Sequence, residues 1–442
     1  MKSSPHLLSV LFALAGMAPS SCMLHAQVPP IRDWNSVKVE LSRTGCLGTC
    51  PAYRVEIHGD GTVLYDGGLF VAITGHHRSS APHEIVKQLL EAFQTAHYMT
   101  LRDRYTWNVT DLPTIKVRLS ADGKSKEIVD YGGERAGMPK SVSALEEAID
   151  RLSDSARWTK GDGATVDALK SEGFDFKSPE GSKILVRVAR LGSAEAVRDL
   201  LSAGVVSSRT PIVTEFGDEE TALGIASTRG DVEMLRALLH TNAKDSKGRE
   251  EALARAASSG ELDAVRLLIR NGANPTSPEV LIGAASSRIP DVVQEILKYR
   301  PNVNARGTQN STALIACFQA NPFANSRVNL KEIVQILLEA GANPTLANDK
   351  GETPLMLNAR DLQVAESLVA HGAPVNAQAK DGFTPLLNAE TIELTRFLLE
   401  HGADPFAKDD NGETALDWAR KMHRKDQAAL LEAAMWKGRK QN

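Results

Sequence analysis

The sequence has few aromatic residues, few cysteines and no large excess of charge of either sign. Aromatic residues make up 5% of the 442-residue chain, there are 4 cysteines, and 51 basic against 55 acidic residues give a net charge of -4. Proteins that bind nucleic acid present a basic surface to the phosphates, so this balance gives no support to a nucleic-acid partner. The hydrophobic fraction of 42% is that of an ordinary globular protein, and the length suggests about two or three domains.

Motifs of catalysis and nucleotide binding are also missing. The chain contains no G-x-x-x-x-G-K-[ST], no H-E-x-x-H and no G-x-S-x-G sequence. After the N-terminal segment, no apolar run reaches the roughly 20 residues that a membrane-spanning helix needs. We therefore predict a protein without enzymatic activity, cofactor, metal or membrane span. An acid–base site made from His76, His77, Asp103 and Asp111 is an alternative whose spacing matches no known template.

The first residues, 1–26, have the pattern of a cleavable export signal. An apolar run at 7–17 follows the basic residue Lys2. A small residue, Ala26, then provides a plausible cleavage site. A buried N-terminal helix is the alternative. Lipid attachment at Cys22 is disfavoured, because Pro19 stands where lipoprotein motifs prefer leucine. The segment predicts an exported protein, located in the periplasm or outside the cell.

Export makes a disulfide the favoured interpretation of the sequence TGCLGTCP, in which Cys46 and Cys50 are three residues apart. Oxidising compartments allow disulfides to persist, and closing so small a loop stabilises the fold by about 2 kcal/mol. A redox-active pair and a zinc site remain alternatives, although thioredoxin-like pairs have two intervening residues and zinc needs four ligands. Cys317 lies in an apolar helical stretch and is expected to be a buried free thiol.

The N-terminal half, residues 35–158, mixes strand and helix patterns. Alternating apolar residues with turn signals at 59–61 and 122–123 predict two antiparallel hairpins. Amphipathic stretches after Pro82 and Pro139 predict two helices. This order predicts a compact α+β domain in which the helices cover one face of the sheet.

This half also resembles an uncharacterised domain of secreted bacterial proteins. The resemblance is carried by the run LSRTGCLGTCPAYRVEIHGDGTVLYDG, with its C-x3-C-P and G-D-G elements, and later by Asp103, Tyr105 and a helix ending near Trp158. It covers most of residues 37–158. The resemblance implies a secreted bacterial setting and a frequent association with repeat modules, and it brings no known activity.

The second half, residues 160–436, repeats itself with a period of roughly 30 residues. A representative unit is GFTPLLNAETIELTRFLLEHGADPFAKD. This unit resembles the ankyrin repeat, which implies an all-α solenoid of about eight helical hairpins. The units begin at Gly181, Glu220, Glu250, Glu279, Ser311, Gly351, Gly382 and Gly412.

Several positions of the unit have a physical reason. Proline, which is favoured in the first turn of a helix, follows threonine at Pro354 and Pro385. Glycine follows the second helix, where a left-handed residue ends it, at Gly272, Gly341, Gly372 and Gly402. The unit also departs from the family pattern. Its histidine after Thr-Pro-Leu is replaced by Met356 and Leu387, and an insertion near Phe323 lengthens the unit from Ser311.

The resemblance implies a non-catalytic protein that binds another protein on the concave surface of the repeats. An alternative gives the N-terminal domain an enzymatic, redox or ligand-sensing role, with the repeats recruiting its target. Residues 437–442 are expected to form a short basic tail. The candidate contact residues lie at the loop tips and in the insertion: Asp349, Lys350, Lys380, Asp381, Asp409, Asp410 and Phe323. The alternative is that these are ordinary solvent-exposed loop residues.

Overall fold

The structure is a computed structural model, and it describes residues 31–206, 211–213, 219–241, 246–319 and 329–441. The predicted signal at 1–26, including Cys22, and the insertion residue Phe323 lie outside the described residues. The chain divides into two compact units. One contains the described residues up to Phe70 together with Thr74–Ala156, and the other contains Val71–Ile73 and the chain from Arg157 onward.

The first unit contains a seven-stranded sheet in the order β4-β3-β2-β1-β6-β7-β5. Two hairpins have the predicted turns, because Gly61 and Gly123 adopt positive φ there. The strands are β1 Lys38–Arg43, β2 Tyr53–His58, β3 Thr62–Gly67, β4 Gly75–Ser80, β5 Arg104–Thr106, β6 Ile115–Ala121 and β7 Lys124–Tyr131. Neighbouring strands are antiparallel except β5, which pairs parallel to β7 and was not predicted.

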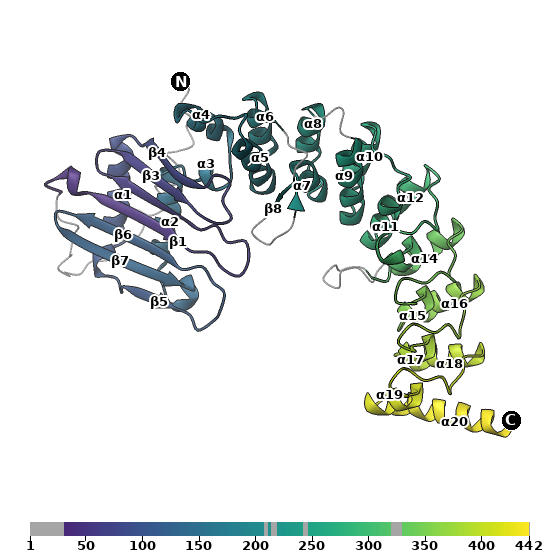
Figure 1. The fold of residues 1–442 in the computed structure, drawn as a ribbon. Helices are drawn as coiled ribbons and strands as arrows, with labels where there is room; N and C mark the ends of the chain where they lie inside the picture. The colour runs from purple at the N-terminus through teal and green to yellow at the C-terminus, as the bar shows by residue number, and fades with distance from the viewer. Residues whose placement is uncertain (1–30, 207–210, 214–218, 242–245, 320–328, 442) are drawn as a thin grey trace. The chain divides into compact units, whose positions relative to one another are not determined.

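Two helices, α1 His83–Thr95 and α2 Lys140–Leu152, cover one face of this sheet (Figure 1). They begin directly after Pro82 and Pro139, as predicted. Strand residues alternate between the helix-covered core and the open face. The core face is apolar at the middle of β1 and its neighbours, with Val39, Leu41, Val55, Ile57, Val117 and Leu119 buried.

The open face of the sheet carries charged side chains that pair across strands. Arg54 Nη2 lies 3.1 Å from Glu40 Oε2, and Lys38 Nζ lies 3.0 Å from Glu56 Oε2. Cross-strand pairs of opposite charge stabilise neighbouring strands, so this face is a solvated surface with most of its charge compensated. The fold is thus the predicted α+β domain.

The second unit begins around Trp158, which is 1% exposed. The backbone N–H of Ile73 donates to the carbonyl oxygen of Trp158 at 2.8 Å, and Arg187 Nε donates to the carbonyl oxygen of Ala72 at 2.9 Å. These contacts group Val71–Ile73 with the second unit. The sequence had placed Trp158 at the end of the first domain, whereas the first unit ends at Ala156 and Trp158 belongs to the second.

Eight pairs of helices follow among the described residues, introduced by α3 Ala156–Thr159 and α4 Gly163–Ser171. The first helices of the pairs are α5 Pro179–Leu191, α7 Ala222–Thr228, α9 Ser246–Ser259, α11 Pro278–Ser287, α13 Ala313–Ala316, α15 Pro354–Leu357, α17 Pro385–Asn388 and α19 Ala415–Lys421. The second helices are α6 Ala194–Ser202, α8 Val232–Thr241, α10 Leu262–Arg270, α12 Pro290–Leu297, α14 Leu330–Glu339, α16 Leu362–Ala370, α18 Ile392–Glu400 and α20 Lys425–Gln441.

Shorter elements complete the fold. A two-stranded ribbon, β8 Ile212–Val213 with β9 Glu219–Glu220, precedes α7. Single turns of 3-10 helix are η3 Trp34–Ser36, η4 Tyr98–Thr100, η5 Gly133–Ala136 and η6 Thr308–Asn310.

The helices form two layers, because each first helix packs on the first helix of the next pair and each second helix on the next second helix (Figure 1). Leu355, Leu386 and Leu416 are buried in this stack, as predicted. The glycines after the second helices adopt positive φ at the predicted positions Gly272, Gly341, Gly372 and Gly402. The all-α repeat architecture is thereby confirmed.

The chain end differs from the predicted separate tail. Helix α20 continues through Gln441, so residues 437–441 are the last turns of that helix. Within the described parts of the chain, no helix combines the length and apolar character required to cross a bilayer.

Candidate functional site

Three long loops, here called fingers, connect the last four helix pairs. They are residues 340–353, 371–384 and 401–414, each lying between a second helix and the following first helix. Each finger makes a tight turn at a glycine with positive φ, namely Gly351, Gly382 and Gly412. Gly382 is also needed sterically, because an added Cβ would lie 2.7 Å from the Asp409 Cα of the next finger.

Backbone hydrogen bonds join each finger to its neighbour. The N–H of Lys380 donates to the carbonyl oxygen of Lys350 at 2.9 Å, and the N–H of Asp410 donates to that of Asp381 at 3.0 Å. The N–H of Asp349 makes the same bond to the Gln309 carbonyl at 3.0 Å. We call this row of backbone hydrogen bonds between consecutive fingers the finger ladder. Five of the predicted contact residues lie in it: Asp349, Lys350, Lys380, Asp381 and Asp410.

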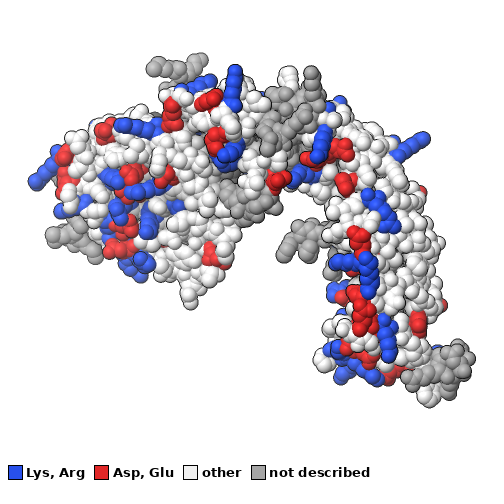
Figure 2. Space-filling view, viewed as in Figure 1, with Lys and Arg blue, Asp and Glu red and all other residues white. Residues whose placement is uncertain are grey.

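The side chains of these five residues are exposed. Asn310 donates to Asp349 Oδ1, and the Phe383 N–H donates to Asp381 Oδ1. Lys350, Lys380 and Asp410 make no side-chain hydrogen bond or ion pair with a described residue. Basic and acidic side chains are interspersed along the last repeats on the face shown in Figure 2. The fingers can thus offer alternating charges to a partner.

Asp409 does not share this exposure and is a correction to the predicted contact set. It is 6% exposed, and its Oδ2 accepts a hydrogen bond from Trp418 Nε1 at 2.9 Å. Its Oδ1 accepts from the backbone N–H groups of Asn411 and Glu413. The Trp418 bond, with these backbone bonds, lowers the pKa of the Asp409 carboxyl. Asp409 therefore holds its own finger in shape and is not available to a partner.

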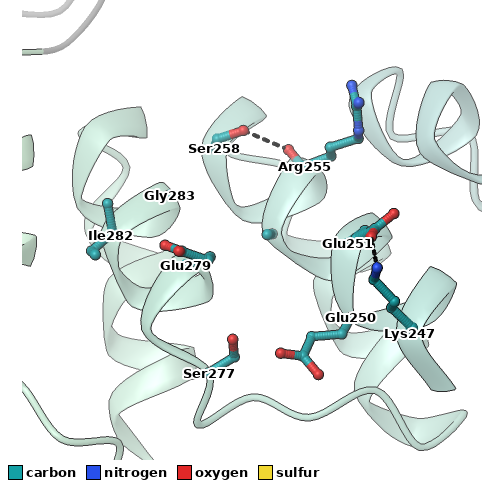
Figure 3. Close-up of a pocket in the computed structure, with 10 residues that line it drawn as sticks. Lys247, Glu250, Glu251, Arg255, Ser258, Ser277, Glu279, Ile282 and Gly283 are labelled. Atoms are coloured by element: carbon teal, nitrogen blue, oxygen red, sulfur yellow. Dashed lines mark hydrogen bonds and ion pairs between the residues drawn. The ribbon is translucent and has the colours of Figure 1, made fainter. Parts of the chain in front are cut away.

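One described connection is much shorter than a finger. The connection from α10 to α11 is residues 271–277, half the length of the finger at 371–384. An open hollow of about 550 Å³ lies between α9 and α11 at this place (Figure 3). The sequence analysis did not predict this hollow, although the sequence shows that few residues separate the glycine at 272 from Pro278.

The hollow is shaped by a close contact between the two helices and by the side chains that line it. Gly283 allows close approach of the helices, because a Cβ there would lie 2.9 Å from the Ala254 carbonyl oxygen. The hollow is lined by residues of α9, of α11 and of the position before α11: Lys247, Glu250, Glu251, Ala254, Arg255, Ser258, Ser277, Glu279, Ile282 and Gly283.

The two cysteines of the first unit form a disulfide, with a Cα–Cα distance of 5.5 Å between Cys46 and Cys50. The bond closes the loop between β1 and β2 just beyond the facing residues Arg43 and Tyr53. Cys317 is a free cysteine and fully buried, and this burial raises the pKa of its thiol to about 12.

The alternative metal and acid–base sites gain no geometric support. Within the ranges the structure describes, no group of three or more His, Cys, Asp or Glu side chains could hold a metal ion. His76 Nδ1 lies 3.2 Å from Asp66 Oδ1 on the exposed β4 edge, while Asp103 pairs with Lys126 at 2.7 Å. The four residues of the proposed acid–base site are thus not assembled in one place.

A buried polar cluster joins α2 to the end of the sheet. Asp150 Oδ2 accepts from Arg43 Nη2 at 2.9 Å, and Asp150 Oδ1 accepts from the Tyr53 hydroxyl at 2.6 Å. Burial raises the pKa of the Tyr53 hydroxyl, and the Asp150 charge adds to this shift. Tyr53 therefore stays protonated as a donor, and the cluster fixes α2 against β1 and β2.

Glu146 lies beside this cluster and is less well compensated. It is 5% exposed, its nearest cation is Arg43 Nη2 at 4.0 Å, and its Oε1 has no hydrogen-bond partner among the described residues. Burial raises the pKa of the Glu146 carboxyl to about 7, which Arg43 opposes and the Asp130 charge reinforces. The carboxyl is an ionisable group in the core that sequence patterning did not reveal.

Comparison with family models agrees with both halves of the fold. Residues 185–279 and 323–409 match the family described as ankyrin repeats (3 copies), and residues 390–432 match ankyrin repeats (many copies). Residues 37–153 match a domain of unknown function (DUF6438). The chain thus carries an ankyrin-repeat domain behind an uncharacterised N-terminal domain, and ankyrin repeats indicate a protein–protein interaction.

A curated relative is similar to part of the chain. The chain is similar to the ankyrin repeat and KH domain-containing protein mask-1 of Caenorhabditis elegans, with 31% identity over 215 residues. The similarity covers 44% of this chain and 8% of that protein. The chain therefore spans a small fraction of the relative's length.

The cysteine geometry predicts a specific thiol count. In the Cys22→Ser full-length chain, titration with a thiol reagent should detect no reactive thiol in the native protein, because Cys317 is buried and the other two cysteines are bonded. Denaturation without reductant should release Cys317 alone, and reduction should add Cys46 and Cys50. Two thiols reactive in the native state would contradict the disulfide.

The Glu146 environment predicts a pH-dependent stability. Because the folded pKa of about 7 lies above the ordinary glutamate value of 4.5, the folded state binds more protons between these values, and stability falls as pH rises through that window. The loss of stability is about 3 kcal/mol. Glu146→Gln should therefore raise the melting temperature at pH 8 relative to the parent, with a smaller or no gain at pH 4.5.

The matched control is Glu147→Gln, an exposed neighbour on the same helix. Its melting temperature should follow that of the parent at both pH values. An equal shift of Glu146→Gln at pH 4.5 and pH 8 would rule out ionisation of the buried carboxyl as the cause.

Proposed function

We propose that this is an exported, non-catalytic binding protein that holds a partner protein on the first-helix and finger side of its ankyrin repeats. The observation that carries the proposal is the finger ladder. Backbone bonds fix the positions of Lys350, Lys380 and Asp410 and leave their side chains unpaired and exposed. Side chains presented on a pre-organised backbone lose less conformational entropy on binding, which favours affinity.

Export is supported by the sequence of the first residues and by the cysteine pair. Residues 1–26 have the pattern of a signal peptide, and a disulfide between Cys46 and Cys50 is typical of oxidising compartments. The proposed location is the periplasm or the outside of a bacterial cell, and the proposed partner is a protein of that compartment.

The test is affinity capture from the envelope fraction with the full-length protein as bait. The triple variant Lys350→Ala, Lys380→Ala and Asp410→Ala removes the unpaired finger side chains. Its partner retention should fall about tenfold, since exposed charged pairs contribute about 0.2–1 kcal/mol each and a tenfold change in affinity is about 1.4 kcal/mol. The readout is the amount of each captured protein relative to bait.

The matched control is the triple variant Arg270→Ala, Glu366→Ala and Arg396→Ala. It changes the net charge by the same amount, but on the second helices. These residues are exposed and lie on α10, α16 and α18. The control should retain the partner as the parent does. A partner that is lost equally from both variants, or from neither, would contradict binding through the fingers.

A further inference from the structure

We propose that one end of the sheet in the first unit docks onto the surface of an anionic phospholipid bilayer. This inference goes beyond the partner binding assigned to the repeats and does not depend on it. Strands β1, β3 and β5 run in the same direction, so the segments that follow them lie at the same end of the sheet. Within the first unit these segments are residues 44–52, 68–70 and 107–114, here called the loop end.

Hydrogen bonds join the three segments of the loop end. The N–H of Thr44 donates to the Thr114 carbonyl oxygen at 3.0 Å, and the N–H of Ala52 donates to the Leu69 carbonyl oxygen at 2.9 Å. The disulfide closes the first segment as well. The loop end is therefore one surface with a fixed backbone, and its side chains can contact a bilayer together.

The loop end exposes large apolar side chains and carries almost no charge. Asp111 is the one charged residue in its three segments, although charged residues make up 24% of the chain. The hairpin turns at the opposite end of the sheet contain Asp60 and Asp122. Exposed apolar patches mark interaction or membrane surfaces. The large apolar side chains exposed at the loop end are Leu47, Leu69, Trp107, Val109 and Leu112.

Trp107 is held in a defined position at the loop end. Its N–H donates to the Tyr131 carbonyl oxygen at 2.7 Å, and the Tyr131 hydroxyl donates to the Val109 carbonyl oxygen at 2.9 Å. Gly132 leaves room for it, because a Cβ there would lie 2.4 Å from the Trp107 Cβ. Tryptophan is enriched at membrane–water interfaces, since its ring is apolar while its N–H is polar. An exposed tryptophan on an ordered, nearly uncharged surface therefore favours a bilayer interface.

A row of residues with excess positive charge crosses the open face of the sheet next to the loop end. The acidic member, Asp66, has His76 beside it, and Arg54 pairs with acidic residues of the same face. Lys116 and Arg104 are exposed and make no ion pair or hydrogen bond with a described residue. Such cations complement anionic headgroups when apolar side chains enter the bilayer surface. The strand register aligns the row as His76, Asp66, Arg54, Ser42, Lys116, Val129 and Arg104.

The test is co-sedimentation of the full-length protein with vesicles of phosphatidylcholine and phosphatidylglycerol in equal parts. The parent should bind saturably, and more weakly at high salt. The variant Leu47→Ser with Leu112→Ser should bind about tenfold more weakly, because two leucines no longer leave water on binding. The variant Arg104→Gln with Lys116→Gln should also lose about tenfold, because two cations no longer face the anionic lipid.

Two matched controls test the location. Tyr299→Ser with Met422→Ser removes two exposed apolar side chains from the second unit. Arg32→Gln with Lys124→Gln removes two exposed cations from the opposite end of the sheet. Both should bind the vesicles as the parent does, and melting temperatures verify that all variants are folded. Control variants that bind as weakly as the loop-end variants would overturn the assignment to this surface.

Fluorescence quenching reports contact at Trp107 itself. Vesicles with brominated acyl chains should quench part of the tryptophan fluorescence of the parent. Trp107→Phe keeps an apolar ring, so it should still bind the vesicles while this quenching disappears. Trp436→Phe changes another exposed tryptophan and should leave the quenching unchanged. Quenching that persists in Trp107→Phe would contradict insertion of the loop end.

Other occupants of the loop end would give different results. The absence of vesicle binding by the parent would overturn the proposal. A dimer in sedimentation velocity that the variant Leu47→Ser with Leu112→Ser loses, without vesicle binding, would assign the surface to a second copy of the chain. An envelope protein lost with the same variant, again without vesicle binding, would assign it to a protein. The triple finger variant should bind vesicles as the parent does, which separates this inference from the proposed function.

Discussion

Stacking of each helix pair on the next is the constraint on which the repeat domain depends. A single pair cannot bury its apolar face, so Leu355 or Leu386 leaves water only because a neighbouring pair covers it. The same stacking sets the finger spacing, since the ladder bonds join consecutive fingers. Polar side chains also join consecutive fingers. Asn376 Nδ2 donates to the Gly402 carbonyl oxygen, and the N–H of Asp404 donates to Asn376 Oδ1.

The proposed contact region of the repeats follows from how this regular stack varies. Where fingers are present, their unpaired side chains stand at a fixed spacing. Before α11 the connection is only residues 271–277, and side chains of α9 and α11 line an open hollow there. The fingers thus offer alternating charges at a fixed spacing, and a partner with matching charges is distinguished from other proteins by geometry as well as by sign.

The sequence predicted most of the architecture because the relevant signals are local. Prolines at 82 and 139 mark helix starts, and glycines at 272 and 402 mark helix ends. The rest depends on contacts between residues far apart in the chain. Strand β5 exists through its parallel pairing with β7, Trp158 is buried with Val71–Ile73, and Asp409 is occupied by the Trp418 indole. None of these contacts leaves a local pattern, so the sequence did not reveal that Asp409 is buried while the other predicted residues of the loop tips are exposed.

Native-state hydrogen exchange of the full-length Leu368→Ala variant tests the stacking constraint most directly. Leu368 is fully buried on α16, and removing it should cost about 2–5 kcal/mol. We expect protection to fall most in the pair α15–α16 and in the pairs on either side, with little change in α5 and α6 and none in the sheet. A uniform loss of protection across both units would contradict a domain stabilised through nearest-neighbour contacts.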